Sequence, residues 1–325
     1  MNRPCHAPSC SLSMLRQRAE LLRRVRQFFD QRGFCEVQTP CLSADTVVDA
    51  YLDPPALASE QLAISSVPLA EELFLQTSPE YAMKRLLVAG AQAIYQVGPV
   101  FRAGERGPLH NPEFTMLEWY RVGHRAADAI DLVDQFCQTI LGRPPCLRLT
   151  YRDAFLQYTS LDPLDAPLEH LREAATACAS ALPEDCSRND LLDLLLSLSI
   201  QPRMCAERPV ILTNYPLSQA ALAQADPDVP GTAERFEWFV DGLELGNGYG
   251  ELRDADVLAR RVAENNRVRR FSGRRELPST SHLEAAMRAG LPPCSGVAVG
   301  FDRLLMVATA AERIDEVLTF PIERA

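Results

Sequence analysis

Residues 100–120 read VFRAGERGPLHNPEFTMLEWY, and this stretch decides the kind of sheet that the chain can form. The flanking runs 93–102 and 113–120 are rich in apolar residues, whereas the segment between them contains Gly, Pro and Arg. This arrangement predicts two strands joined into a hairpin with a long tip.

The hairpin carries side chains suited to a nucleotide. Alternation along a strand places Glu118 beside Tyr120 on one face, and Phe114 beside Met116. Arg102 enters the loop and Phe114 leaves it, so a guanidinium could bind a phosphate bidentately while a ring stacks on a base. Because turns are polar in any protein, this loop alone is weak support for such a site.

The N-terminal third predicts a helix, a strand and a second helix. Apolar residues at helical spacing over 15–31, followed by Gly33, predict the first helix, and the alternating segment 34–40 predicts a short strand. Ser-Pro-Glu at 78–80 supplies an N-cap, a proline at the first helical position and an acid in the first turn. These signals predict a helix running to Ala89.

The rest of the chain predicts an α+β fold, with a large antiparallel β-sheet flanked by helices. Further strands are expected at 74–77, 210–213, 234–241 and 296–299, a loop with one strand at 50–70, helices across most of 125–200, and an Arg-rich helix with a solvated charged face at 257–271. We expect a tail over 1–14 and a single domain over 15–325, with a helical insertion at roughly 125–205.

A second group of functional residues lies in 242–252, which reads GLELGNGYGEL. Glu244 and Glu251 flank a glycine-rich kink. Carboxylates spaced in this way can share Mg²⁺ with triphosphate oxygens or hold an ammonium group. Spacing alone favours the simpler interpretation, an ordinary glycine-rich surface turn with two acids.

A third group lies in 295–303, SGVAVGFDR, where a strand of small residues runs into a helix. The small side chains allow a ligand to approach the strand closely. Arg303 begins the helix and could join its positive end at a phosphate.

Composition excludes some classes of protein. No run of 18 apolar residues and no signal peptide is visible, so we expect a soluble, cytoplasmic protein without membrane contact. The ten cysteines are scattered without a C-x-x-C pair, which favours small buried hydrophobes over zinc ligands or disulfides. A net charge of −10 disfavours a partner that is bound through its phosphates, such as a nucleic acid, although local basic patches could exist.

Lys84 is the only lysine among 33 basic residues. Genomic bias explains this, and the sequence alone offers no physical reason for a special role.

Together these segments resemble the three signature motifs of class II aminoacyl-tRNA synthetases. Residues 36–40 after Gly33 are similar to motif 1, the hairpin to motif 2, and Gly-Phe-Asp-Arg at 300–303 to motif 3. The sequences of residues 110–118 and 244–248 are similar to those of lysyl-tRNA synthetases. The resemblance runs from about Leu15 to the C-terminus, and it implies the class II synthetase fold and a homodimer.

Within that class, the segment 77–85 and the overall layout resemble a family of lysyl-tRNA synthetase paralogues that act on elongation factor P. That family uses ATP to activate (R)-β-lysine as its adenylate and transfers it to a lysine ε-amine of elongation factor P, a tRNA-shaped protein. We expect no room for an N-terminal anticodon-reading OB-fold before motif 1, which makes tRNA an unlikely partner.

The resemblance also implies roles for individual residues. Arg102 and Arg303 are expected to be catalytic, on the α- and γ-phosphates, with Mg²⁺ held by Glu244 and by Glu251. The expected ATP-binding residues are Arg102, Ala103, Gly104, Glu105, His110, Asn111, Phe114, Glu244, Leu245 and Arg303. The amino acid is expected at Ser78, Pro79, Glu80, Glu118, Tyr120, Glu251, Ala298 and Gly300, with Glu80 on the amine near the carboxylate and Tyr120 and Glu251 on the distal ammonium.

Two positions depart from the synthetase pattern. Motif 2 usually reads Arg-x-Glu, but Gly104 stands in the place of the acid and Glu105 follows it. Either the loop shifts to bring Glu105 to the ATP amino group, or that contact is lost. Ala298 stands where lysyl-tRNA synthetases usually have glycine, and its methyl group could reshape the pocket for a β-amino acid.

Two other functions remain open on the sequence. One is a truncated lysyl-tRNA synthetase that acts on tRNA in trans, which the acidic charge disfavours. The other is a catalytically inactive, synthetase-like regulatory protein, which the presence of both motif arginines and both carboxylates disfavours.

Overall fold

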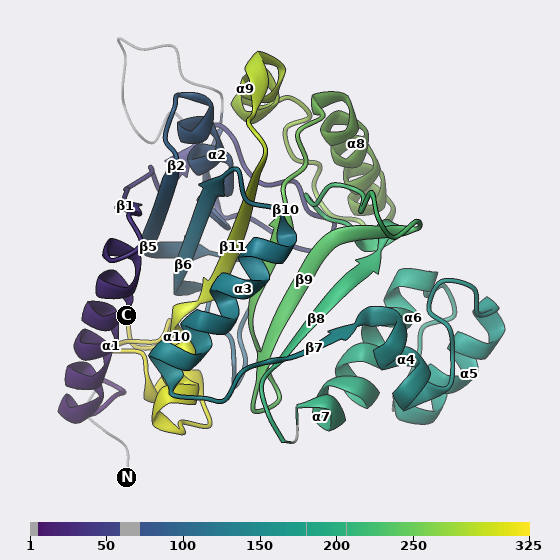
Figure 1. The fold of residues 1–325 in the computed structure, drawn as a ribbon, viewed down its shortest axis with the longest axis horizontal. Coiled ribbons are helices and arrows are strands. Elements are labelled where there is room, and N and C mark those ends of the chain that lie inside the picture. Colours follow the sequence, from purple (N-terminus) through teal and green to yellow (C-terminus); the bar gives the residue numbers. More distant parts are fainter. Residues whose placement is uncertain (1–5, 59–71, 180, 206) are drawn as a thin grey trace. The chain divides into compact units, whose positions relative to one another are not determined.

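The computed structural model describes residues 6–58, 72–179, 181–205 and 207–325. The chain divides into two compact units, Met1–Gly123 with Arg253–Ala325, and His124–Leu252. Each unit contains strands and helices, so the chain is an α+β protein (Figure 1). The helices expected between 125 and 205 belong to the second unit, and the single domain over 15–325 stays a prediction.

The first unit is built on strands that pair in the order β1-β5-β6-β11. These strands are β1 (Cys35–Glu36), β5 (Ala93–Phe101), β6 (Glu113–Val122) and β11 (Cys294–Gly300). β5, β6 and β11 are antiparallel, as expected, whereas β1 runs parallel to β5. A small antiparallel sheet has the order β2-β4-β3, with β2 (Leu42–Ser43), β4 (Glu72–Leu75) and β3 (Ala56–Ala58). The rest of the loop expected at 50–70 lies largely outside the described residues.

One face of this sheet is closed by the first helix, α1 (Leu12–Asp30). The hydroxyl of Ser11 caps it by accepting from the backbone N–H of Met14 at 3.1 Å. The ring of Phe29 stacks on Tyr95 of β5 at 4.7 Å and packs against Trp119 of β6 at 5.1 Å between centroids. Strand alternation therefore assigns Tyr95 and Trp119 to the core, and the neighbouring side chains of β6 point to the other face.

The other helices of the first unit are α2 (Glu80–Val88), α8 (Ala255–Phe271), α9 (His282–Gly290), α10 (Phe301–Thr309) and the short 3₁₀ turn η5 (Ile314–Glu316). The predicted hairpin and the helices at 15–31, 80–89 and 257–271 are confirmed within a few residues. The strand expected over 34–40 shortens to β1, because Thr39 N–H donates at 2.8 Å to the side chain of Gln96 and not to the backbone of β5.

The charged face of α8 differs from the expectation at one position. Arg269 is only 1% exposed, so it is not part of a solvated face. Its guanidinium donates to the backbone carbonyls of Asp49, Leu52 and Arg275, and to Asp53 Oδ1 at 2.6 Å. A planar group with five donors can tie down an irregular loop in this way, and no helical periodicity could have revealed it.

The second unit has strands in the order β10-β9-β8-β7. They are β7 (Leu147–Thr150), β8 (Val210–Pro216), β9 (Thr232–Val240) and β10 (Leu243–Gly250), antiparallel except that β7 runs parallel to β8. The helices are α3 (Ala126–Phe136), α4 (Tyr151–Thr159), α5 (Leu168–Cys178), α6 (Arg188–Leu195) and α7 (Gln201–Met204), with the π-helical turns η2 (Cys137–Leu141) and η3 (Leu196–Ile200) and the 3₁₀ turn η4 (Leu217–Gln219).

The core of this unit is formed by apolar side chains of α4–α7 packed on β8 and β9, among them Phe155, Leu191, Leu212 and Phe239. Phe136 of α3 packs edge-on against Trp238 at 6.1 Å between centroids. β7 was not predicted, since it has only four residues, and this short stretch does not stand out from the helical pattern around it.

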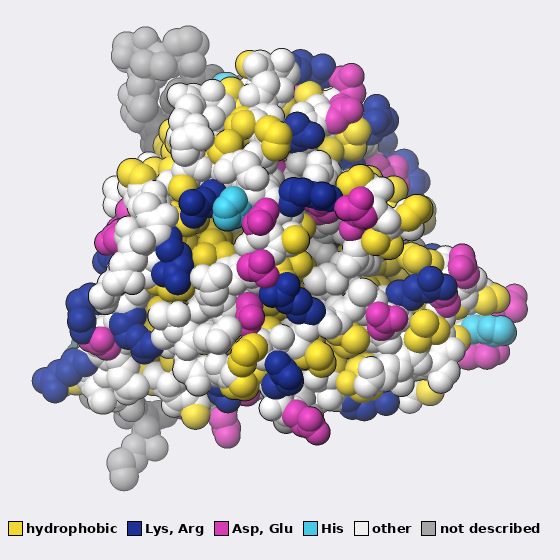
Figure 2. Space-filling model, in the orientation of Figure 1, with side chains coloured by type: hydrophobic (Ala, Val, Ile, Leu, Met, Phe, Trp, Pro, Cys, Tyr) yellow, Lys and Arg dark blue, Asp and Glu magenta, His cyan; other side chains and the backbone are white. Residues whose placement is uncertain are grey.

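The surface of the protein carries two of the cysteines and a mixture of charges. Cys35 and Cys178 are exposed, so the interpretation of all cysteines as buried hydrophobes is wrong for these two. On the face drawn in Figure 2, acidic and basic side chains are interspersed. Among the described residues, no helix combines the length and the apolar character needed to cross a membrane.

Candidate active site

A buried carboxylate with two hydroxyl donors lies on β6, on the face opposite α1. Glu118 is only 1% exposed. Tyr120 Oη donates to Glu118 Oε1 at 2.6 Å, and Ser78 Oγ donates to Oε2 at 2.8 Å. The prediction that Glu118 and Tyr120 share a face is confirmed, and Ser78 joins them from the start of α2.

Small residues lie beside this carboxylate on β11, whereas its register partner on β5 is the buried side chain of Gln96. The register places Ala298 of β11 opposite Glu118, and Gly300 of β11 and Gly98 of β5 on either side of Met116. Paired residues in a sheet point to the same face, so these positions present only hydrogen atoms or a methyl group beside Glu118. The glycine and alanine pattern of β11 thus leaves room for a ligand over β6.

Burial changes the acidity of this group. Loss of water, and then the nearby charge of Glu80, raise the pKa of Glu118 to about 7, against the opposing effects of Tyr120, Ser78 and Lys84. Glu118 can therefore carry a proton or a negative charge near neutral pH. An ammonium group placed beside it would favour the charged form.

A second carboxylate, Glu80, begins α2 and is 8% exposed. Its backbone N–H donates to Ser78 Oγ at 3.0 Å, so the same serine links Glu80 to Glu118. Lys84 Nζ donates to Glu80 Oε1 at 2.5 Å. The sequence analysis missed this ion pair, although the single lysine four residues after an acid on a helix was a usable signal.

The hairpin loop brings together the residues predicted to hold a nucleotide. The guanidinium carbon of Arg102 lies 5.1 Å from the centre of the Phe114 ring, so the two side chains adjoin across the mouth of the hairpin. Glu105 Oε1 lies 3.9 Å from Arg102 Nη1. Gly104, between them, has a φ of +79°, a left-handed conformation that glycine adopts readily. Whether Glu105 replaces the acid missing from position 104 stays a prediction.

Arg303 and His110 also meet. Arg303 Nη2 lies 2.5 Å from His110 Nε2, and Arg303 Nε is 3.5 Å from the carbonyl of Leu109. Burial, and then the charge of Arg303, lower the pKa of His110. A neutral imidazole can accept from the guanidinium, so this pair forms a cationic site with one positive charge.

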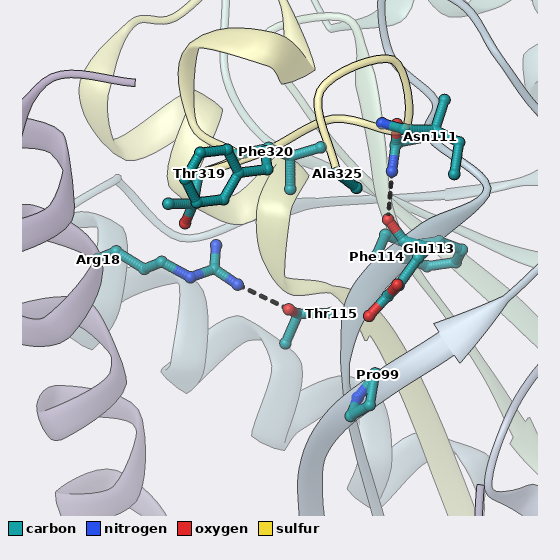
Figure 3. A pocket seen from close by; sticks show the side chains of 11 residues that line it. Arg18, Pro99, Asn111, Glu113, Phe114, Thr115, Thr319, Phe320 and Ala325 are labelled. Carbon is teal, nitrogen blue, oxygen red and sulfur yellow. Dashed lines mark hydrogen bonds between the residues drawn. The ribbon is translucent and has the colours of Figure 1, made fainter. Parts of the chain in front are cut away.

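Asn111 has a different position from the other loop residues. Its Nδ2 donates to the carbonyl of Glu113 at 2.7 Å, and its Oδ1 accepts from Ile322 N–H at 3.1 Å. Both amide atoms therefore tie the hairpin to the C-terminal segment, while the expected ATP contact stays a prediction. A cavity of about 220 Å³ lies beside it, where Arg18 of α1 donates to Thr115 at 2.6 Å (Figure 3).

In the second unit, the stretch 242–252 is not a surface turn but mostly the strand β10. A bulge between Glu244 and Gly246 places one extra residue, Leu245, against β9. Residues 244 and 251 would lie on opposite faces of a regular strand. The bulge reverses the alternation, so Glu244 and Glu251 come to the same face.

The glycines of β10 have a steric reason. A Cβ on Gly248 would overlap the ring of Phe236, and one on Gly250 would overlap the carboxylate of Glu234. Large side chains of β9 lean across these positions. The glycine pattern therefore serves strand packing as well as any ligand.

The carboxylates on and next to β10 are ligands of the chemical type found in magnesium–nucleotide sites. Mg²⁺ in such sites uses one or two carboxylates together with phosphate oxygens and water. Glu244 and Glu251 supply two carboxylates on one strand face. Within the described parts of the chain, no cluster of three acidic, histidine or cysteine side chains could hold a metal by itself.

The fold and these motifs define a synthetase-type catalytic core. Residues 9–324 match the family of class II tRNA synthetases (D, K and N), and the chain belongs to that family. The chain is 44% identical over 322 residues to the elongation factor P–(R)-β-lysine ligase of Vibrio cholerae serotype O1, with 98% of each chain covered. It is 42% identical to the ligase of that name from Pseudoalteromonas translucida and 41% identical to that from Salmonella arizonae, again over 98% of each chain.

Proposed function

We propose that this protein is a ligase that activates (R)-β-lysine with ATP and transfers it to the ε-amino group of a lysine of elongation factor P. The observation that carries the proposal is the pair of buried carboxylates, Glu80 and Glu118, beside the hydroxyl of Tyr120. A substrate with two ammonium groups needs buried negative charge, because an unpaired ammonium is costly to remove from water. The names of relatives 41–44% identical to the chain support the substrate and the acceptor.

ATP would bind at the hairpin and at the start of α10. Arg102 and Arg303 would neutralise the phosphates, and the ring of Phe114 would stack on the base. Bound Mg²⁺, held by Glu244 with Glu251 as a second candidate, would supply further positive charge to the triphosphate. Arginines fixed before the reaction stabilise the charge that develops at the α-phosphorus, and orientation of the two substrates supplies much of the remaining rate.

In the activation step, a carboxylate oxygen of β-lysine would form a bond to the α-phosphorus of ATP, and the bond from that phosphorus to pyrophosphate would break. The neutral ε-amine of the acceptor lysine would then attack the acyl carbon of the adenylate. An amide forms, the bond from that carbon to the oxygen of AMP breaks, and the amine gives up a proton. The proposal includes a homodimer and a cytoplasmic location, as the family resemblance implies.

Mass spectrometry of elongation factor P tests the proposal directly. The factor is incubated with the enzyme, ATP and either (R)-β-lysine or α-lysine, and the expected result is addition of one β-lysyl group to one lysine. Transfer of label to tRNA instead of to the factor would establish the truncated-synthetase alternative. Absence of ATP–pyrophosphate exchange with either amino acid would favour the inactive regulator.

A further inference from the structure

Lys84 is unusual in both composition and position. It is the only lysine among the chain's 33 basic residues, and it is only 1% exposed. Its Nζ lies 2.5 Å from Glu80 Oε1, one helical turn away on α2. Lysine is rarely buried unless its charge is paired, and an apolar side chain of similar length could fill the same space. The buried charge itself therefore needs an explanation.

The ion pair adjoins the residues assigned to the amino acid. Ser78 Oγ accepts from the backbone N–H of Glu80 at 3.0 Å and donates to the carboxylate of Glu118 at 2.8 Å, so one hydroxyl links the start of α2 to Glu118. Lys84 Nζ also lies 6.0 Å from the centre of the Tyr120 ring. Lys84 thus contacts the carboxylate of Glu80 from within the same helix, and its charge acts on Glu118 from a greater distance.

The hydrogen bond between Lys84 and Glu80 is charge-assisted, and such bonds are short and strongly directional. It therefore fixes the direction of the Glu80 carboxylate, with one oxygen on Lys84 and the other left to bind a second group. This arrangement prepares Glu80 to bind a second, mobile ammonium.

We propose that Lys84 is a positioning residue for the amino-acid substrate: its fixed ammonium orients the carboxylate of Glu80 beside Glu118, so that Glu80 receives the substrate amine nearest the reacting carboxylate. The inference rests on the proposed function. Lys84 acts through Glu80 and does not contact the reacting atoms.

A double-mutant cycle in ATP–pyrophosphate exchange tests this role. Lys84→Met keeps the length of the side chain and removes its charge. We expect it to raise the KM for (R)-β-lysine about tenfold or more, with a much smaller change in kcat and in the KM for ATP. In a Glu80→Gln background the same substitution is expected to add little. Arg85→Met, an exposed neighbour on α2, is the matched control and is expected to behave as the unmodified protein.

The single lysine permits a second measurement that needs no variant. Protein labelled with [¹⁵Nζ]lysine has one side-chain ammonium to observe by NMR, and we expect its signal to move on addition of (R)-β-lysine. 6-Aminohexanoate lacks the amine assigned to Glu80 and is expected to move the signal far less.

Three results would overturn the role of Lys84: an unchanged KM in Lys84→Met, fully additive effects in the cycle, or an NMR signal that saturating (R)-β-lysine does not move. If Lys84→Met does not fold, the NMR titration decides. Failure of the unmodified protein to catalyse exchange would instead refute the proposed function. The titration would then still test the contact between the amino acid and Glu80–Lys84.

Discussion

Replacing Glu118 by glutamine will make the protein more stable at high pH. Burial raises the pKa of Glu118 from 4.5 to about 7 in the folded state. The unfolded chain therefore loses this proton near pH 4.5, while the folded protein keeps it until about pH 7. Between these values the folded state binds more protons, so its stability falls as pH rises.

The magnitude follows from the two pKa values. Each tenfold difference in proton affinity corresponds to about 1.4 kcal/mol, so the interval from 4.5 to about 7 corresponds to about 3 kcal/mol. A glutamine is neutral at every pH and avoids this loss. Its amide can also satisfy the hydroxyls of Ser78 and Tyr120, since a hydroxyl both donates and accepts.

Urea unfolding at a series of pH values from 5 to 8.5 measures the effect. Part of the effect is already present at pH 5, so we expect the free energy of unfolding of Glu118→Gln to exceed that of the unmodified protein by about 2.5 kcal/mol more at pH 8.5 than at pH 5. Glu113→Gln, an exposed acid on the same strand, is the control. A pH-independent difference between Glu118→Gln and the unmodified protein would refute the reasoning, because it would mean that Glu118 ionises as readily in the folded as in the unfolded state.

Three further predictions concern other parts of the two units. Ala298→Gly removes the methyl group opposite Glu118 and is expected to raise activation of α-lysine relative to β-lysine in pyrophosphate exchange; an unchanged ratio would contradict this. Gly248→Ala forces a Cβ into a β9 ring and is expected to cost about 1–3 kcal/mol of unfolding free energy in denaturant titration, whereas Gly107→Ala, which meets open space, is expected to cost much less. Arg18→Met removes the ion-pair partner of Asp302, a carboxylate of α10 that is only 1% exposed, and is expected to lower the free energy of unfolding by about 3 kcal/mol. A loss no larger than that of Arg23→Met, at an exposed position of α1, would contradict this.

Local patterns predicted much of the first unit correctly. The apolar runs on either side of the loop at 102–112 indicated the hairpin β5–β6, and Ser-Pro-Glu at 78–80 indicated the start of α2. Period-two alternation placed Glu118 and Tyr120 on one face, and their hydrogen bond confirms it. These signals depend on neighbouring residues, so the sequence was sufficient.

Contacts between distant segments were harder to predict. Arg269 lies on an Arg-rich helix, and only the loop at 49–53 makes it a buried structural group. Asn111 was expected only at the nucleotide, and its hydrogen bonds to the backbone of Glu113 and Ile322 were not predicted. The composition of each segment gave no sign of these contacts, because they depend on which distant chain segment packs beside it.

The sequence by itself determined the family, the hairpin and the identity of the acids and arginines of the candidate site, because motifs and alternation are local. Only the tertiary structure decided their states. The bulge at Leu245 put Glu244 and Glu251 on one face, burial raised the pKa of Glu118, and helix packing enclosed the Glu80–Lys84 pair. Register, dehydration and the distance between charges arise only when the chain is folded, and these properties set how a carboxylate can bind an ammonium group.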